Sequence, residues 1–189
     1  GVFFRANDFY ENEQFEQARK LVVDTLKDSP QDEAFVDMYG AILIELGKIS
    51  EARALYEDLM SKGENPIRLN NLAWCSFLDG KDIPKAIEFV KRALDLEPRM
   101  GFGYGTLGCL YLRESRYQEA LDTLRQAIHL NKSPRSLACN ACYAAVASGY
   151  LGDCDAKADY LQLVCILNPN YKLLEAARSP SPEMPLRSS

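Results

Sequence analysis

The fold is decided by residues 104–128, which read YGTLGCLYLRESRYQEALDTLRQAI. The first half carries apolar or small side chains at the three- and four-residue spacing of a helix, at Tyr104, Leu107, Gly108 and Tyr111. The second half repeats this spacing at Ala120, Leu121, Leu124, Ala127 and Ile128. A short polar segment separates the halves. The stretch therefore predicts two helices joined by a turn, with small residues in both that let the helix axes approach closely.

The same two-helix pattern recurs along the chain, as two sets of small residues show. The first set has intervals of 33 to 37 residues and consists of Ala6, Gly40, Ala73, Gly108 and Ala145. The second set follows the first by 12 or 13 residues and consists of Ala18, Ala52, Ala86, Ala120 and Ala158. A proline then closes each unit, at Pro30, Pro66, Pro98, Pro134 and Pro169. Because proline stops a helix, the sequence predicts about five stacked helix pairs.

On these residues the sequence resembles the tetratricopeptide repeat family. The fourth unit matches the family signature at Tyr104, Leu107, Gly108, Tyr111, Tyr117, Ala120, Leu124 and Ala127. The resemblance implies an all-α fold, a right-handed α-solenoid of about five repeats whose first helices line a concave groove for peptides or protein segments. The expected units are residues 1–32, 33–65, 66–99, 100–134 and 135–170, followed by a short cap and a disordered tail within 171–189.

Composition excludes several other classes of protein. The 189 residues are 47% hydrophobic and 26% charged, as in ordinary globular proteins, and the net charge of −5 makes nucleic acid an unlikely partner. The longest weakly polar stretch is shorter than the ~20 residues of a membrane helix, so no membrane span is expected. No signal peptide is visible, which predicts a cytoplasmic location, although Gly1 rather than Met at the start is consistent with a truncated N-terminus.

Three features that resemble catalytic or cofactor sites are better explained by structure. The G-x-G-x-x-G pattern of residues 103–108 follows a predicted helix instead of the strand that a dinucleotide site requires, although its two additional glycines could leave room for a partner. Cys139 and Cys142 lie within one predicted helix and have no second C-x-x-C motif to complete a zinc site. His129 is the only histidine and has no nucleophile motif beside it. We therefore expect no enzyme activity, no metal and no cofactor.

The candidate groove follows from the inward-facing positions of the family's first helices. These positions form a mainly apolar and aromatic surface, made of Asn7, Tyr10, Met38, Asn70, Asn71, Trp74, Phe77, Phe102, Tyr143 and Tyr150. Family members that clamp a terminal carboxylate use basic side chains that are missing from the third unit, so this ligand is not expected. The surface instead favours an amphipathic helix or an extended segment with apolar anchors, bound around Trp74, Phe77 and Phe102.

The predicted function is that of a non-catalytic protein–protein interaction scaffold or chaperone with a protein or peptide partner. A first alternative is an RNA-binding array that resembles pentatricopeptide repeats, suggested by GKISEARALYE at residues 47–57. Only the second unit reads this way, and RNA repeats read bases with polar side chains in a basic groove. A second alternative is a small secretion chaperone of the bacterial type, which such repeats also build.

Overall fold

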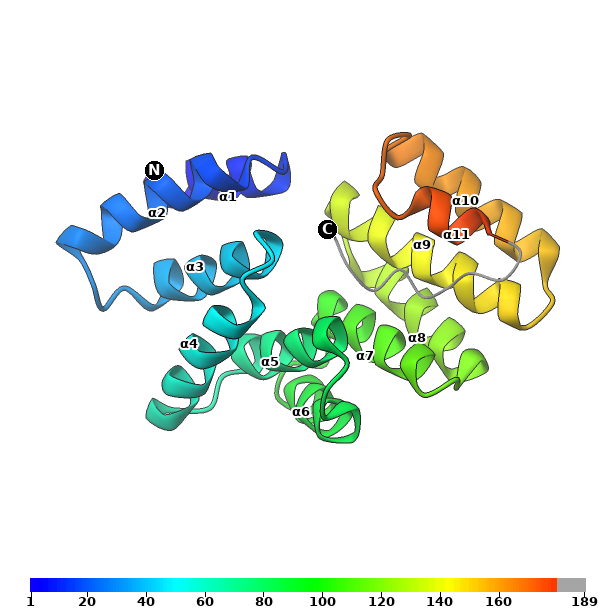
Figure 1. The fold of residues 1–189 in the computed structure, drawn as a ribbon, viewed down its shortest axis with the longest axis horizontal. Coiled ribbons are helices and arrows are strands. Elements are labelled where there is room, and N and C mark those ends of the chain that lie inside the picture. The colour runs from blue at the N-terminus through cyan, green and yellow to red at the C-terminus, as the bar shows by residue number, and fades with distance from the viewer. Residues whose placement is uncertain (180–189) are drawn as a thin grey trace.

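The computed structural model describes residues 1–179, and all the regular elements in this range are helices (Figure 1). They are α1 (Val2–Glu11), α2 (Phe15–Asp28), α3 (Glu33–Glu45), α4 (Ile49–Lys62), α5 (Pro66–Asp79), α6 (Ile83–Leu96), α7 (Gly101–Arg113), α8 (Tyr117–Leu130), α9 (Pro134–Tyr150), α10 (Cys154–Leu167) and α11 (Leu174–Arg178). The expected all-helical fold is confirmed. The division into five units stays an interpretation of the sequence, while the structure gives five consecutive helix pairs and then α11.

The helix pairs follow one another around a curve. Figure 1 shows the first pair, α1 and α2, facing the last helices, α9 to α11, across the open side of the molecule, with α5 and α6 midway between them. The odd-numbered helices α5, α7 and α9 pack successively on one another, and α3 also contacts α5. The curve therefore places the first helix of each pair on its concave side, as the stacking of solenoid repeats requires.

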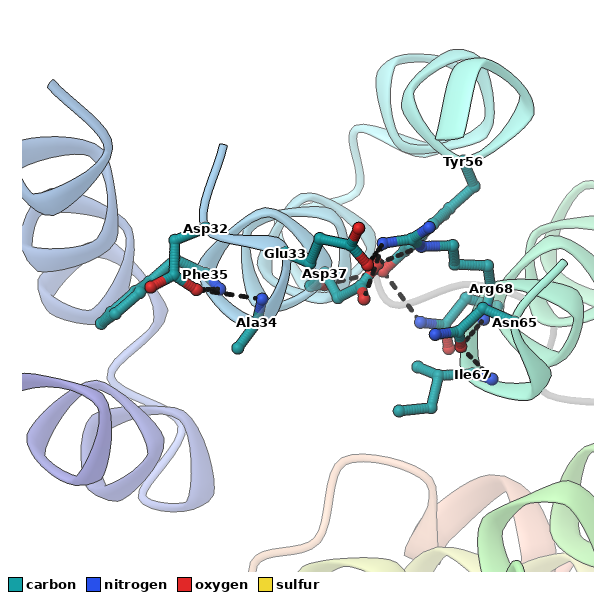
Figure 2. Close-up of polar contacts among 10 residues, drawn as sticks. Asp32, Glu33, Ala34, Phe35, Asp37, Tyr56, Asn65, Ile67 and Arg68 are labelled. Carbon is teal, nitrogen blue, oxygen red and sulfur yellow. Dashed lines mark hydrogen bonds and ion pairs between the residues drawn. The ribbon is translucent and has the colours of Figure 1, made fainter. Parts of the chain in front are cut away.

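The helix ends are set by short polar residues and proline. Asn65 caps α5, because its side-chain oxygen accepts hydrogen bonds from the backbone N–H groups of Ile67 (2.8 Å) and Arg68 (3.4 Å). Pro66 occupies the first position of α5, where its missing N–H leaves no donor unsatisfied. Asp32 caps α3 in the same manner, and both caps are visible in Figure 2. The sequence thus fixes where these two first helices begin.

Small residues allow close contact within pairs, as the repeat pattern predicts. A Cβ atom at Gly108 would lie 2.6 Å from the side chain of Leu124 in the partner helix α8. A Cβ atom at Gly40 would lie 2.4 Å from the ring of Tyr56, which is fully buried between α3 and α4. Both distances are far below van der Waals contact, so each glycine is required by the side chain that fills the space above it.

The hydrophobic core is divided among several clusters along the array. One small cluster joins α1, α2 and α3 around Ala6, Val22 and Ile42. The largest cluster extends from α5 to α11. Tyr171, before α11, and Ala177, within it, belong to this cluster, so the expected short helix after the fifth pair is present and covers the end of the array.

Two further expectations concern the C-terminal tail and membrane-crossing helices. The predicted disordered tail, residues 178–189, lies outside the described residues from position 180 onward. Among the described residues, none of the helices has the length and apolar character that crossing a membrane would require.

Candidate protein-binding groove

A groove with a volume of about 520 Å³ lies on the concave side of the array. Side chains of all five first helices line it, together with the segment that leads into α11. Eight of the ten predicted site residues are among the lining residues, namely Asn7, Tyr10, Met38, Asn70, Asn71, Trp74, Phe102 and Tyr143. The curvature thus brings together side chains that are up to 136 positions apart in the sequence, from Asn7 to Tyr143. Their role in binding stays a prediction.

Phe77 and Tyr150 do not line the groove, so their assignment to its surface is corrected. Phe77 is fully buried, with its ring stacked on Trp74 at a centroid distance of 4.8 Å and edge-on to Tyr143 at 5.6 Å. Phe77 therefore lies beneath the groove surface and packs against Trp74, which lines it. Tyr150 is the last residue of α9 and stacks on Tyr117 of α8 at 4.4 Å. Tyr150 therefore packs against the second helix of the preceding pair and not in the groove.

The apolar part of the groove is formed by exposed and half-buried side chains from four helices. Phe3 of α1, Ile67 of α5 and Phe102 of α7 are large apolar residues that remain exposed to solvent. Trp74 is half-buried and is held by its stacking on Phe77, with Met38 of α3 on the same lining. Exposed apolar side chains that converge on a concave surface indicate a binding site for another molecule.

Amide side chains of α5 and α9 form a polar part of the groove. Asn71 donates a hydrogen bond of 2.8 Å from Nδ2 to the hydroxyl of Tyr56. Asn70 is only 4% exposed and donates to the Asn71 oxygen at 3.3 Å, but no described residue donates to its own buried Oδ1 atom. Asn140 fills the space over Gly105, where a Cβ atom would lie 2.5 Å from the Asn140 oxygen. Asn70 Oδ1 is therefore a buried acceptor without a donor among the described residues.

A buried ion pair joins α3 to α5, as Figure 2 shows, and its Asp37 side also lines the groove. The guanidinium of Arg68, which is almost fully buried, contacts the Asp37 carboxylate through Nε at 2.8 Å and through Nη2 at 3.3 Å. Nη2 also reaches Glu33 at 2.9 Å. Tyr56 of α4 donates a hydrogen bond to the backbone oxygen of Asp37 at 2.9 Å. These contacts fix the second pair against the third.

A second polar cluster lies at the rim of the groove and was not predicted from the sequence. Arg135, near the start of α9, forms an ion pair with Glu45 of α3, with 2.6 Å between Nη2 and Oε2. Its guanidinium also lies over the rings of Tyr10 (4.9 Å) and Phe15 (5.3 Å). Pro134 is the available signal, because a proline at the first position makes α9 begin earlier than the repeat pattern alone suggests.

Burial and charge shift the pKa values in this rim cluster. Burial raises the pKa of Tyr10 above its usual value, and the carboxylate of Glu45 raises it further. Burial alone would lower the pKa of Arg135, but the carboxylate of Glu45, through its charge and its hydrogen bond to Arg135, acts in the opposite direction, and the pKa lies above its usual value. Arg135 therefore stays positively charged, and Tyr10 stays a neutral hydrogen-bond donor to Glu45.

The cysteines near the groove are buried or half-buried thiols. Burial raises the pKa of Cys109 and Cys139, and it raises that of Cys142 to about 12. All three thiols therefore stay protonated at neutral pH, whereas metal binding and nucleophilic attack require thiolates. Within residues 1–179 there is no group of three or more His, Cys, Asp or Glu side chains placed to hold a metal ion.

The glycine-rich pattern has a structural explanation within α7. It lies inside this helix, which follows α6, and so lacks the strand of a dinucleotide site. The expectation that its additional glycines leave room for a partner is wrong, because side chains of the chain itself fill the space. A Cβ atom at Gly103 would lie 2.7 Å from Met100, and Gly105 is covered by Asn140.

Comparisons with known proteins identify the repeat family. The tetratricopeptide repeat is matched at residues 5–66 and again at residues 103–134. Among solved structures, the thermophilic TPR protein TTC0263 of Thermus thermophilus has a TM-score of 0.75 and 17% identity, with 92% of this chain and 93% of that chain covered. The APC/C hetero-tetramer Cut9-Hcn1 has a TM-score of 0.77 and 17% identity, with 93% of this chain and 34% of that chain covered.

Curated relatives are longer proteins that match over part of their length. Protein bimA of Emericella nidulans is 29% identical over 125 residues, which are 64% of this chain and 15% of the relative. The mitochondrial import receptor subunit TOM70 of Rattus norvegicus is 21% identical over 137 residues, which are 69% of this chain and 22% of the relative. The chain thus spans less than a quarter of either protein. From the matched repeats and the shared fold, this chain belongs to the tetratricopeptide repeat family.

Proposed function

We propose that this chain is a non-catalytic protein–protein interaction scaffold that holds an apolar or amphipathic segment of a partner protein in its concave groove. The groove of about 520 Å³ carries this proposal, because it combines Trp74, Met38 and Phe102 in one surface. Aromatic side chains in a concave site dominate binding energy in protein interfaces. The name of TOM70, an import receptor subunit, supports a role in recognising other proteins.

The polar part of the groove defines what the segment must offer besides apolar side chains. Asn70 Oδ1 is a buried acceptor without a donor among the described residues, and an unsatisfied buried polar group is costly. A backbone or side-chain N–H of the partner would satisfy it. The segment therefore places apolar side chains against Trp74 and Phe102 and directs an N–H group to Asn70.

The charges around the groove favour a protein over RNA as the ligand. The lining includes the carboxylates of Glu11, Asp37 and Glu45 and the cations of Arg135 and Lys172. Asp37 already pairs with Arg68, and Arg135 already pairs with Glu45. A groove with this balance lacks the excess of positive charge that RNA phosphates require. The chaperone role, including that of a secretion chaperone, would use the same groove and the same kind of segment.

A selection from a phage-displayed library of random peptides tests the proposal. We expect the wild-type chain to enrich peptides rich in apolar residues, and a synthetic copy of such a peptide to shift the emission of Trp74 to the blue. Phe102→Asp should weaken its binding by about tenfold or more, because Phe102 lines the groove and is 42% exposed.

Phe4→Asp is the matched control. Phe4 is 74% exposed and is not among the groove residues, so this variant should bind the peptide as the wild type does. Equal binding by all three proteins would place the peptide elsewhere on the molecule and contradict the proposal. Circular dichroism of both variants checks that they keep the wild-type helix content.

A further inference from the structure

The start of α9 meets the first two helix pairs across the mouth of the groove. Arg135 contacts Glu45 of α3 and lies 3.8 Å from the carboxylate of Glu13, in the turn between α1 and α2. Ser133, the residue before α9, donates a hydrogen bond to the carboxylate of Glu11. Repeats of a solenoid ordinarily contact only their neighbours. Here the last pair contacts the first and the second.

This closure depends on side chains and not on helix packing. Among the described residues, α9 packs against α7, α8, α10 and α11, whereas α1 packs against α2. No comparable helix contact joins α9 to α1, α2 or α3. The guanidinium of Arg135, placed over the rings of Tyr10 and Phe15, is thus the centre of the connection between the two ends.

The charges of the rim are positioned so that the contact can break without stranding a buried charge. Arg135 is 20% exposed and Glu45 is 14% exposed, and both side chains line the groove. When the ends separate, both groups gain water together, so neither is left unpaired in an apolar interior. The pair is in direct contact and largely shielded from water, so salt weakens it little and a competing charge is needed to displace it.

We propose that Arg135 is an electrostatic latch that closes the array across the mouth of the groove. With Arg135 held by Glu45, the ends stay together and the groove is narrow. When charges of a partner displace this pair, the ends separate and the groove widens. The latch is a property of the free chain and goes beyond the proposed function, because its test requires no partner.

Trp74 reports the state of the latch, because it is the only tryptophan and lines the groove. Acrylamide is a neutral quencher, so the charges around the groove do not attract or repel it. Its access to Trp74 therefore measures how open the groove is. We expect Arg135→Gln to have a higher quenching constant than the wild type, because the ends are no longer held together by the ion pair with Glu45. Small-angle scattering should show a larger radius of gyration for Arg135→Gln.

Two further variants make the test decisive. Glu45→Gln removes the same ion pair from the other side and should reproduce the effect of Arg135→Gln. If one of the two variants folds poorly, the other still tests the latch. Arg19→Gln removes the exposed pair with Glu16 on α2, far from α9 in the packing order, and should behave as the wild type. Quenching and radius of gyration that are identical for the wild type, Arg135→Gln and Glu45→Gln would overturn the latch. Such a result would not affect peptide binding at Phe102.

Discussion

Tyr56 shows how a single residue connects the packing of one helix pair to the groove. Its ring occupies the space above Gly40, and its hydroxyl donates to the backbone oxygen of Asp37 while accepting from Asn71. The ring is fully buried and its hydroxyl makes two hydrogen bonds, so the side chain cannot shift without losing these contacts. Asn71 lines the groove, and its position therefore depends on the absence of a side chain at Gly40.

Gly40→Ala is expected to destabilise the chain by about 1–3 kcal/mol, because the new methyl group would overlap the held ring of Tyr56. Urea denaturation followed by circular dichroism measures the change. Gly63→Ala is the matched control, since no atom lies within 4 Å of a Cβ atom at that position. An unchanged stability of Gly40→Ala would show that the tyrosine ring can relocate at no cost.

The relative placement of α3 and α5 is governed by polar contacts as well as apolar packing. Arg68 of α5 contacts Asp37 and Glu33 of α3, and it is almost fully buried. Arg113 of α7 donates a hydrogen bond to the backbone oxygen of Phe77 in α5, which provides a similar link to the next pair. Such directed contacts set the angle between successive first helices more strictly than small apolar side chains do.

Arg68→Met is expected to lower the free energy of unfolding by about 3 kcal/mol, because it leaves the Asp37 carboxylate buried without its partner. The double variant Arg68→Met/Asp37→Leu should recover most of this loss, since it removes the unpaired charge. Chemical denaturation of the three proteins measures both changes. Arg19→Met, which breaks an exposed pair, should cost at most about 1 kcal/mol. A loss no larger than this for Arg68→Met would rule out a structural role for the buried pair.

The helices were predictable from the sequence to a greater extent than the groove surface. Small residues, prolines and apolar spacing identify each pair, because these signals act within about 35 residues. The inward-facing positions implied by the family resemblance assign Phe77 to the groove, although its ring is buried behind Trp74. Periodicity identifies the inner half of a helix, but whether a side chain there faces the groove or the next helix depends on the angle between pairs.

At the scale of the whole molecule, no local pattern in the sequence indicates which residues join the two ends. Glu45 and Arg135 are 90 positions apart and belong to different pairs, so no local pattern connects them. Their contact results from the total curvature of the array, to which each interface between pairs contributes a small angle. A small change at one interface, such as that held by Arg68, would therefore be amplified at the rim.

The contact between the ends also has a consequence for the kinetics of folding. A linear array folds rapidly through contacts between neighbours, whereas Arg135 can meet Glu45 only after the pairs between them have stacked. We expect Arg135→Gln to accelerate unfolding and to leave the folding rate unchanged, as measured by stopped-flow fluorescence of Trp74. A slower folding rate would mean that the ends meet before the middle forms. With the contact in place, each terminal pair gains a second neighbour. Local unfolding from either end must therefore first break the contacts of Arg135.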